Sequence, residues 1–325
     1  MRDTTGMGLR GGIDLGGTKI QAAVVGVRNG VRGEARIPTP KDGGPEGVLR
    51  AMAEAVAAAA TQAGVATSDL DGVGIGSPGE VDPAAGTVTN AYNVVPDWNR
   101  TINVAGILEK ELGTRIGLGN DVRVATTAEF ELGAGKPYTS LLGVFWGTGV
   151  GGGVILNGGP WRGRGAAGEI GHMVVRRNGA TCTCGRKGCM EAYSGRRAME
   201  LEARRRHHAG EKTSLFKIME KKGRPALTSG VWADALDHGD RLTVDLIDRA
   251  VAALGAGIAS AVNLLDVEAV VIGGGLGTRL GDPYVERIRT AMHPHLFVDT
   301  RPPAVHLAAL GDLSGALGAA LLVRS

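Results

Sequence analysis

The chain has 325 residues, which exceeds the usual size of a single domain and predicts two lobes with a cleft between them. Hydrophobic residues make up 43% and charged residues 21%, a mixture that is typical of soluble globular proteins and excludes a disordered or fibrous chain. The formal net charge of +3 comes from 36 basic and 33 acidic residues. This nearly even balance argues against nucleic acid or a membrane as the main partner.

The N-terminal residues contain no apolar stretch of the kind found in secretory signals, and no apolar run approaches about 18 residues. We therefore expect a cytoplasmic protein that does not insert into a membrane. The 54 glycines exceed twice the average usage without forming a collagen-like triplet repeat. Such an excess predicts tight turns and close backbone approaches to ligands.

The first part of the chain has the pattern of short strands followed by helices. Gly16 and Gly17 are expected to turn the first strand into the second, and Asn29-Gly30 the second into the third. The pattern predicts strands over residues 9–15, 20–27, 31–37, 72–77 and 115–119, and helices over residues 46–63, 102–112 and 122–132.

A second strand, glycine turn and strand stands in the middle of the chain. Its sequence GVFWGTGVGGGVIL is similar to GIDLGGTKIQAAVV near the start, which indicates either two copies of one supersecondary unit or a coincidence between glycine-rich hairpins. The pattern predicts strands over residues 141–146, 152–156, 269–272 and 304–309, and mainly helices over residues 190–265, with a long one at 241–265 and a last one at 314–323.

Strands that alternate with helices predict an α/β fold in two lobes, with the glycine turns at strand ends facing the crevice. We expect a small N-terminal lobe of residues 1–120 plus 311–325, and a larger C-terminal lobe of residues 121–310. Residues 207–240 carry no functional motif, and we expect them to form a peripheral helical insertion that puts no catalytic residue in doubt.

The stretch DLGGTK, residues 14–19, ends a strand in a carboxylate and continues with bare backbone, a hydroxyl and a cation. Such a turn can hold phosphate through its amides, and Asp14 can hold Mg²⁺ through water. A purely structural hairpin explains the two glycines equally well. The glycine spacing of a Walker loop is absent, so any phosphate transfer must use the geometry of another fold.

Two further glycine clusters offer similar backbone. Gly147-Thr148-Gly149 is a second candidate cradle for phosphate, and Gly273-Gly274-Gly275 would let an adenine or ribose lie against the main chain. A tight connection without a ligand is the simpler interpretation of each cluster taken alone.

All three cysteines lie within eight residues, and their odd number and close spacing argue against a disulfide framework. His172, Cys182, Cys184 and Cys189 make up a complete tetrahedral zinc set, which leaves no open position and predicts a structural site. The alternative is three reduced surface cysteines beside a capping histidine.

Asn120-Asp121 stands where a strand is expected to end and a helix to begin. Both residue types are preferred helix N-caps, so capping is the plain interpretation. The functional interpretation is a catalytic carboxylate that is oriented by its neighbour.

These motifs together resemble the ROK (repressor, open reading frame, kinase) family of sugar kinases and sugar-responsive regulators, within the actin-like, hexokinase-type ATPase superfamily. The resemblance covers nearly the whole chain and is specific, because eight motifs follow in the order of the family. They are DLGGTK at 14–19, GSPGEVD at 76–82, AYNVVPDW around Asn93, ND at 120–121, GTGVGGG at 147–153, GEIGH at 168–172, CTCGRKGCME at 182–191 and GGG at 273–275.

The resemblance implies a two-lobed actin-like ATPase (hexokinase/ribonuclease H-like) fold with a structural zinc loop, and an ATP-dependent hexose kinase that converts glucose to glucose 6-phosphate. Asp121 would be the base that receives the proton of the sugar hydroxyl. The residues implied to hold the sugar are Asn93, Asn120, Asp121, Glu169, His172 and Glu191. Those implied around the phosphates and Mg²⁺ are Asp14, Gly16, Gly17, Thr18, Lys19, Thr148 and Gly149, and those beside the adenosine are Gly273, Gly274 and Gly275.

By the same resemblance, one ring nitrogen of His172 would bind zinc and the other a sugar hydroxyl, so zinc would organise the sugar site without touching phosphate. N-acetylglucosamine, N-acetylmannosamine, mannose or fructose as substrate, and polyphosphate as donor, stay open as alternatives. A sugar-sensing regulator is the alternative of another class, although only about 13 residues precede Asp14, which leaves no room for DNA-binding helices. The family also favours a homodimer or a larger assembly.

Overall fold

The computed structural model describes residues 8–324. It divides into two compact units: unit 1 contains the residues up to Leu132 and those from Asp312 onward, and unit 2 is Gly133–Gly311. The first boundary thus falls after α3 (Asp121–Leu132) rather than at residue 120, because α3 packs against α11 (Ser314–Leu321) of unit 1.

Unit 1 is built on a five-stranded sheet with the strand order β3-β2-β1-β4-β7. The strands are β1 (Arg10–Leu15), β2 (Lys19–Val25), β3 (Val31–Pro38), β4 (Val73–Ser77) and β7 (Ile116–Asn120). The strands β1 to β3 form antiparallel hairpins, whereas β1, β4 and β7 run parallel. The predicted strands of this part are therefore confirmed, with ends that differ by one or two residues.

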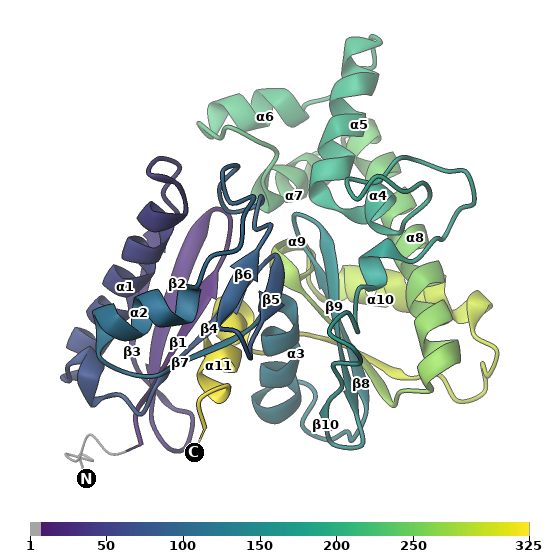
Figure 1. The fold of residues 1–325 in the computed structure, drawn as a ribbon. Coiled ribbons are helices and arrows are strands. Elements are labelled where there is room, and N and C mark those ends of the chain that lie inside the picture. Colours follow the sequence, from purple (N-terminus) through teal and green to yellow (C-terminus); the bar gives the residue numbers. More distant parts are fainter. Residues whose placement is uncertain (1–7, 325) are drawn as a thin grey trace. The chain divides into compact units, whose positions relative to one another are not determined.

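Both faces of this sheet are covered by helices (Figure 1). Successive strand residues point to opposite faces, and a Cβ on Gly11 would meet Val56 of α1 (Gly44–Ala63), whereas a Cβ on Gly12 would meet Ala316 of α11. The helix α2 (Val104–Leu112) begins two residues later than predicted, because the Asn103 side chain caps it and accepts from the Gly106 amide. The remaining short elements of unit 1 are η1 (Thr67–Asp69), β5 (Glu80–Asp82), β6 (Thr87–Thr89) and η4 (Gly311–Leu313), which begins at the boundary.

Unit 2 is built on a second five-stranded sheet, with the order β10-β9-β8-β11-β12. Its strands are β8 (Leu141–Trp146), β9 (Val150–Leu156), β10 (Gly159–Pro160), β11 (Ala269–Gly273) and β12 (Ala304–Leu307). Again the first three strands are antiparallel, and β8, β11 and β12 are parallel. The equal strand order and directions of the two sheets favour the interpretation of two copies of one supersecondary unit over coincidence.

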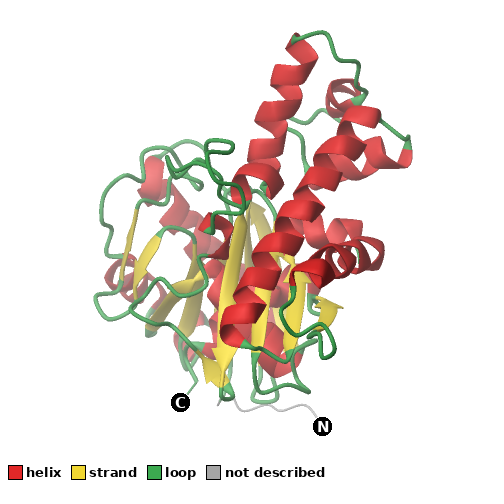
Figure 2. Ribbon diagram, turned by 90° about the vertical axis from the view of Figure 1, so that its right-hand side faces the viewer, coloured by secondary structure: helices red, strands yellow, loops and turns green. Residues whose placement is uncertain are grey.

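Helices dominate the rest of unit 2, as predicted. They are η2 (Ile170–His172), α4 (Glu191–Ser194), α5 (Arg196–His208), α6 (Leu215–Lys221), α7 (Ser229–Asp237), α8 (Arg241–Leu265), α9 (Gly274–Leu280), α10 (Asp282–Met292) and η3 (His293–His295). The long α8 has the predicted bounds. Figure 2 shows it crossing in front of the strands of its sheet, and its apolar residues belong to the same core cluster as those of β8 and β11.

The segment 207–240 is helical, as predicted, but the expectation that it is peripheral is wrong. Leu215, Leu227, Val231 and Trp232 are fully buried in the core of unit 2. The segment is therefore part of this unit's hydrophobic core.

No helix within residues 8–324 is both long enough and apolar enough to cross a membrane.

Candidate functional site

The turn between β1 and β2 is held from its carbonyl side. The Thr39 hydroxyl donates to the Gly16 carbonyl at 2.6 Å, and the Thr39 amide donates to the Thr18 carbonyl at 3.1 Å. The Lys41 ammonium donates to the Gly17 carbonyl. These bonds fix the conformation of the predicted phosphate turn. Thr39 and Lys41 were missed from the sequence, because no motif links them to a turn more than twenty residues earlier.

Gly17 brings the loop that carries Asn93 against this turn. A Cβ on Gly17 would lie only 2.1 Å from the Asn93 carbonyl oxygen, so any other residue would displace the loop. Lys41 bridges the two segments, since it also donates to the Val94 carbonyl at 3.3 Å. A predicted phosphate turn and a predicted sugar residue thus lie side by side within unit 1.

Asp14 lies near the end of β1, where it pairs with Gly76 on β4. Burial and, to a smaller extent, the nearby Asp121 carboxylate raise the pKa of Asp14 to about 7, while Lys19 acts in the opposite direction. The Lys19 ammonium itself pairs with Asp312 at 3.0 Å. A desolvated carboxylate beside a second carboxylate is well suited to a divalent cation, so these residues fit the Mg²⁺ that was predicted here.

The raised pKa of Asp14 predicts a pH-dependent stability. Between the unfolded pKa of 3.8 and the folded pKa of about 7, the folded state binds more protons than the unfolded one. The free energy of unfolding should therefore fall as pH rises through this window, by at most about 1.4 kcal/mol per pH unit. We expect urea unfolding of the Mg²⁺-free protein to show this slope relative to Asp14→Asn.

The matched control for this experiment is Asp71→Asn, which removes an exposed carboxylate at the opposite end of β4. Its stability should follow that of the wild type from pH 5 to pH 8. If Asp14→Asn also ran parallel to the wild type, the raised pKa of Asp14 would be refuted.

Asn120 and Asp121 occupy the junction between β7 and α3. The Asn120 Oδ1 atom accepts from the Arg123 amide at 3.2 Å, so Asn120 does cap the helix. Its Nδ2 atom donates to Asp121 Oδ1 at 2.9 Å, and the same oxygen accepts from the Val122 amide at 2.9 Å. Asn120 therefore caps α3, as the plain interpretation predicts, and at the same time orients the Asp121 carboxylate, as the functional interpretation requires.

In unit 2, the turn between β8 and β9 lies against Glu191. One carboxylate oxygen of Glu191 accepts from the Val150 amide at 2.8 Å, and a Cβ on Gly149 would lie 2.2 Å from that oxygen. The other oxygen accepts from the Thr183 hydroxyl at 3.1 Å. Glu191 thus joins the glycine turn to the cysteine loop, a connection that the sequence did not indicate.

The same turn is anchored on the first residues of α5. The amides of Arg196 and Arg197 donate to the Gly147 and Thr148 carbonyls at 3.1 and 3.0 Å. The Arg196 guanidinium donates to the Thr148 hydroxyl at 3.0 Å and to the Ser229 hydroxyl at 2.9 Å. Arg196 was missed from the sequence. Its place directly after CTCGRKGCMEAYSG was the only available signal.

The loop GEIGH packs on β9 through close backbone contacts. A Cβ on Gly168 would lie 2.5 Å from the Gly152 carbonyl oxygen, and a Cβ on Gly171 would lie 2.0 Å from the Val150 carbonyl oxygen. The glycines of two separate motifs are thus needed for one contact. This contact sets the position of His172 at the end of η2.

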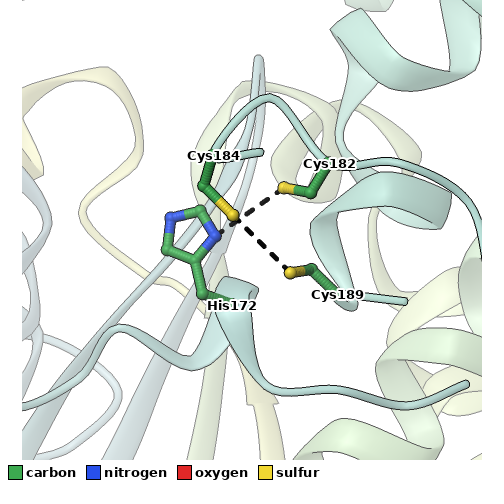
Figure 3. A group of neighbouring side chains, drawn as sticks. All are labelled: His172, Cys182, Cys184 and Cys189. Atoms are coloured by element: carbon green, nitrogen blue, oxygen red, sulfur yellow. Dashed lines mark hydrogen bonds between the residues drawn. The ribbon is translucent and has the colours of Figure 1, made fainter. Parts of the chain in front are cut away.

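The side chains of His172, Cys182, Cys184 and Cys189 converge, with their four ligand atoms all within 4.8 Å of one another (Figure 3). The Cys184 and Cys189 sulfurs are 3.7 Å apart, and Cys182 Sγ lies 3.8 Å from His172 Nδ1. A tetrahedral zinc with Zn–S bonds of about 2.3 Å places its ligand atoms about 3.6 to 3.8 Å apart. The cluster therefore fits a zinc ion bound through Nδ1, with the Nε2 atom pointing away from the cysteines.

Metal binding at this cluster depends on the protonation of its thiols. Burial raises the pKa of Cys182, and it raises the pKa of Cys189 to about 12. Without a cation these two thiols are neutral, whereas metal ligation requires thiolates. Binding of a divalent cation would release their protons.

The three glycines that follow β11 form a strand-to-helix connection, since Gly273 ends β11 and Gly274 begins α9. Gly274 has a φ of +80°, and a Cβ there would lie 2.6 Å from backbone atoms of Trp146. The Gly275 amide nitrogen lies 3.7 Å from the position of a Cβ on Gly147. The second candidate phosphate turn and the predicted adenosine site thus adjoin within unit 2.

The predicted residues form two groups. Unit 1 brings together Asp14, the turn 16–19, Asn93, Asn120 and Asp121. Unit 2 brings together Thr148, Gly149, Glu191, the four metal-ligand candidates and the turn 273–275. Glu169 is exposed and precedes η2, directly after the contact of its loop with β9.

Known proteins are similar to this chain over nearly its whole length. A glucokinase of Streptomyces coelicolor is 34% identical over 322 residues, 98% of each chain, and an N-acetylgalactosamine kinase of a Shewanella species is 33% identical over 325 residues, 96% of this chain and 95% of the relative. The crystal structure of a ROK family glucokinase from Streptomyces griseus in complex with glucose and AMPPNP superposes with a TM-score of 0.82 and 33% identity, over 97% of this chain and 99% of that one. Together with the paired sheets, this likeness establishes the actin-like ATPase fold. Since a model of the ROK family also matches residues 10–325, the chain belongs to that family.

Proposed function

We propose that this protein is an ATP-dependent sugar kinase that phosphorylates glucose at the 6-hydroxyl, with Asp121 as the general base. The observation that carries the proposal is the arrangement at the start of α3. There the Asp121 carboxylate is held by Asn120 and by the Val122 amide, in the same unit as the phosphate turn and Asp14. The 34% identity to a glucokinase across 98% of both chains supports it.

The proposed mechanism requires Asp121 to accept one proton and does not require it to be a strong base. A carboxylate is too weak a base to ionise a sugar alcohol beforehand, so it accepts the proton late, as the phosphoryl group bonds to the oxygen. Most of the catalysis then comes from positioning and charge neutralisation, because phosphoryl transfer passes through a loose transition state in most analyses. A carboxylate fixed by two hydrogen bonds meets the demand for positioning.

The other predicted residues receive matching roles. In unit 1, Asp14 would hold Mg²⁺, and the turn with Gly16, Gly17, Thr18 and Lys19 would contact phosphate. In unit 2, Thr148 and Gly149 would contact phosphate, and Gly273, Gly274 and Gly275 would lie beside the adenosine. Bound Mg-ATP supplies the phosphoryl group. The sugar would be held by Asn93, Asn120, Asp121, Glu169, His172 and Glu191.

A second candidate is an N-acetylhexosamine kinase. The N-acetylgalactosamine kinase relative is 33% identical, almost as similar as the glucokinase, so overall identity alone does not favour glucose. The side chains favour it for a physical reason. The carboxylate oxygens of Glu169 and Glu191 are hydrogen-bond acceptors, which suits adjacent sugar hydroxyls.

We expect glucose to exceed N-acetylglucosamine by at least about a hundredfold in kcat/KM. An acetamido group adds a bulky acyl arm, and a displacement of the sugar of about 1 Å can cost on the order of a hundredfold in rate. Steady-state kinetics on a panel of sugars with Mg-ATP measures the ratio. Equal kcat/KM for an N-acetylhexosamine would remove the glucose assignment and leave the kinase assignment intact.

The same preparation distinguishes an enzyme from a sugar-sensing regulator. A coupled assay of ADP release with glucose should show turnover. Filter binding with operator-like DNA should show no DNA binding. DNA binding without turnover on any sugar of the panel would refute the proposed function.

A further inference from the structure

Arg196 stands out among the cations of unit 2 because it is half-buried and lacks an ionic partner. Its guanidinium donates to two neutral hydroxyls, those of Thr148 and Ser229, and forms no ion pair with a carboxylate of residues 8–324. Glu200 is the acidic residue whose charge acts on it. However, Glu200 is already bound by Arg204 at 2.6 Å and by the Leu227 amide at 3.0 Å.

A desolvated, unpaired guanidinium is costly, and buried charges in proteins are usually paired. Burial indeed lowers the pKa of Arg196 from the ordinary arginine value. Arginine nevertheless keeps its charge at neutral pH and has more N–H donors than the two hydroxyls use. The site therefore has positive charge and free donors, but no anion among the described residues.

The surroundings of Arg196 identify the anion. The backbone amides of residues 196 and 197 fix the turn 147–149, and the guanidinium reaches the hydroxyl of that same turn. Ser229, its other partner, lies near the position of a Cβ on Gly275, at 3.7 Å. Arg196 is thus placed between the candidate phosphate turn and the candidate adenosine connection, all within unit 2.

We propose that Arg196 binds the phosphate chain of the nucleotide directly, and that Ser229 holds its guanidinium in place. The inference rests on the proposed kinase function and deepens it. It also gives the segment 207–240 a role, since Ser229 orients a nucleotide-binding residue. Planar guanidinium groups suit phosphate oxygens because they form charge-assisted, often bidentate hydrogen bonds.

The test is calorimetric titration of Mg-ATP into Arg196→Met, Arg196→Lys and the control Arg197→Met. Arg197 is exposed and its side chain makes no hydrogen bond or ion pair within the described residues, so its loss should leave affinity within about twofold. Loss of a charge-assisted bond corresponds to about tenfold or more in Kd. We expect Arg196→Met to lose at least that, and Arg196→Lys to recover part of it, because a lysine keeps the charge.

Glucose titration of the same variants separates a direct contact from structural damage. Its Kd should be unchanged in Arg196→Met, with the unfolding temperature near that of the wild type. Mg-ATP affinity within twofold of wild type in Arg196→Met, or a parallel loss of ATP and glucose affinity, would overturn the inference. If the wild type binds ATP through Arg196 but phosphorylates no sugar, the kinase proposal fails and the Arg196 assignment stands.

Discussion

Asp121→Asn should reduce kcat by about 10² to 10⁴ while leaving glucose affinity within a few fold of the wild type. General base catalysis typically contributes this much, and an amide has nearly the shape of the carboxylate but cannot take the proton. The oxygen of the new amide can still accept from the Val122 amide, as Asp121 Oδ1 does at 2.9 Å. The local geometry should therefore survive the substitution.

Turnover and binding have to be measured on the same protein to make this prediction sharp. A coupled ADP-release assay gives kcat, and calorimetry gives the Kd of glucose. Asp71→Asn, an equal change of charge at a distant exposed position of unit 1, should keep wild-type kinetics. A variant at position 121 that kept about a tenth of the wild-type kcat would show that Asp121 is not the base.

Asn120→Ala provides an intermediate case. It removes the donor to Asp121 Oδ1 and the cap of the Arg123 amide, but it leaves the Asp121 carboxylate in place. Loss of a cap typically costs about 1 kcal/mol of stability. We expect a fall in kcat that is clearly smaller than that of Asp121→Asn, because the proposed base itself is kept. Glucose affinity should fall as well, because Asn120 is also proposed to hold the sugar.

The elements of this fold that could be predicted from the sequence are those with strong local signals. The strand at 141–146 and the helix at 241–265 were predicted with the bounds that the structure shows. A glycine turn follows the strand, and a long apolar periodicity runs through the helix. The likeness between the two glycine-rich hairpins indicated the repeated sheet. Boundaries that depend on a cap, such as Asn103 before α2, were less precise.

The contacts between distant segments could not be predicted in this way. Arg196 and Ser229 are 33 residues apart, and Ser229 lies in a segment without a motif. The segment 207–240 was expected to be peripheral because it carries no functional motif, yet its Leu215 and Trp232 are fully buried. Local pattern indicates candidate functional residues, but their supporting partners are set by tertiary packing.

Glu191 illustrates the same limit at the zinc cluster. From the sequence, zinc was expected to organise the sugar site without touching phosphate. In the structure, one oxygen of Glu191 accepts from the Thr183 hydroxyl in the cysteine loop. The other accepts from the Val150 amide, at the end of the candidate phosphate turn. Disorder in the cysteine loop should therefore reach both candidate sites of unit 2.

Loss of the metal is consequently expected to have the largest effect on stability. We expect one zinc per chain in the wild type, and Cys184→Ser should retain far less than one. Structural zinc contributes folding free energy outright. A loss of about 4 kcal/mol would lower the unfolding temperature by on the order of 10 °C for a unit of this size. Elemental analysis and thermal unfolding measure the two quantities.

Thr183→Ala is the control that separates metal loss from loss of the Glu191 hydrogen bond. It removes the hydroxyl that donates to Glu191 but none of the four ligand candidates, so zinc content and unfolding temperature should stay close to wild type.

Because Glu191 connects the loop to the turn, Cys184→Ser should weaken both glucose and Mg-ATP binding, the latter through the Val150 contact. Added zinc should restore the chelator-treated wild type and not Cys184→Ser. A metal-free wild type with full activity and unchanged thermal stability would show that the four side chains do not form a structural zinc site.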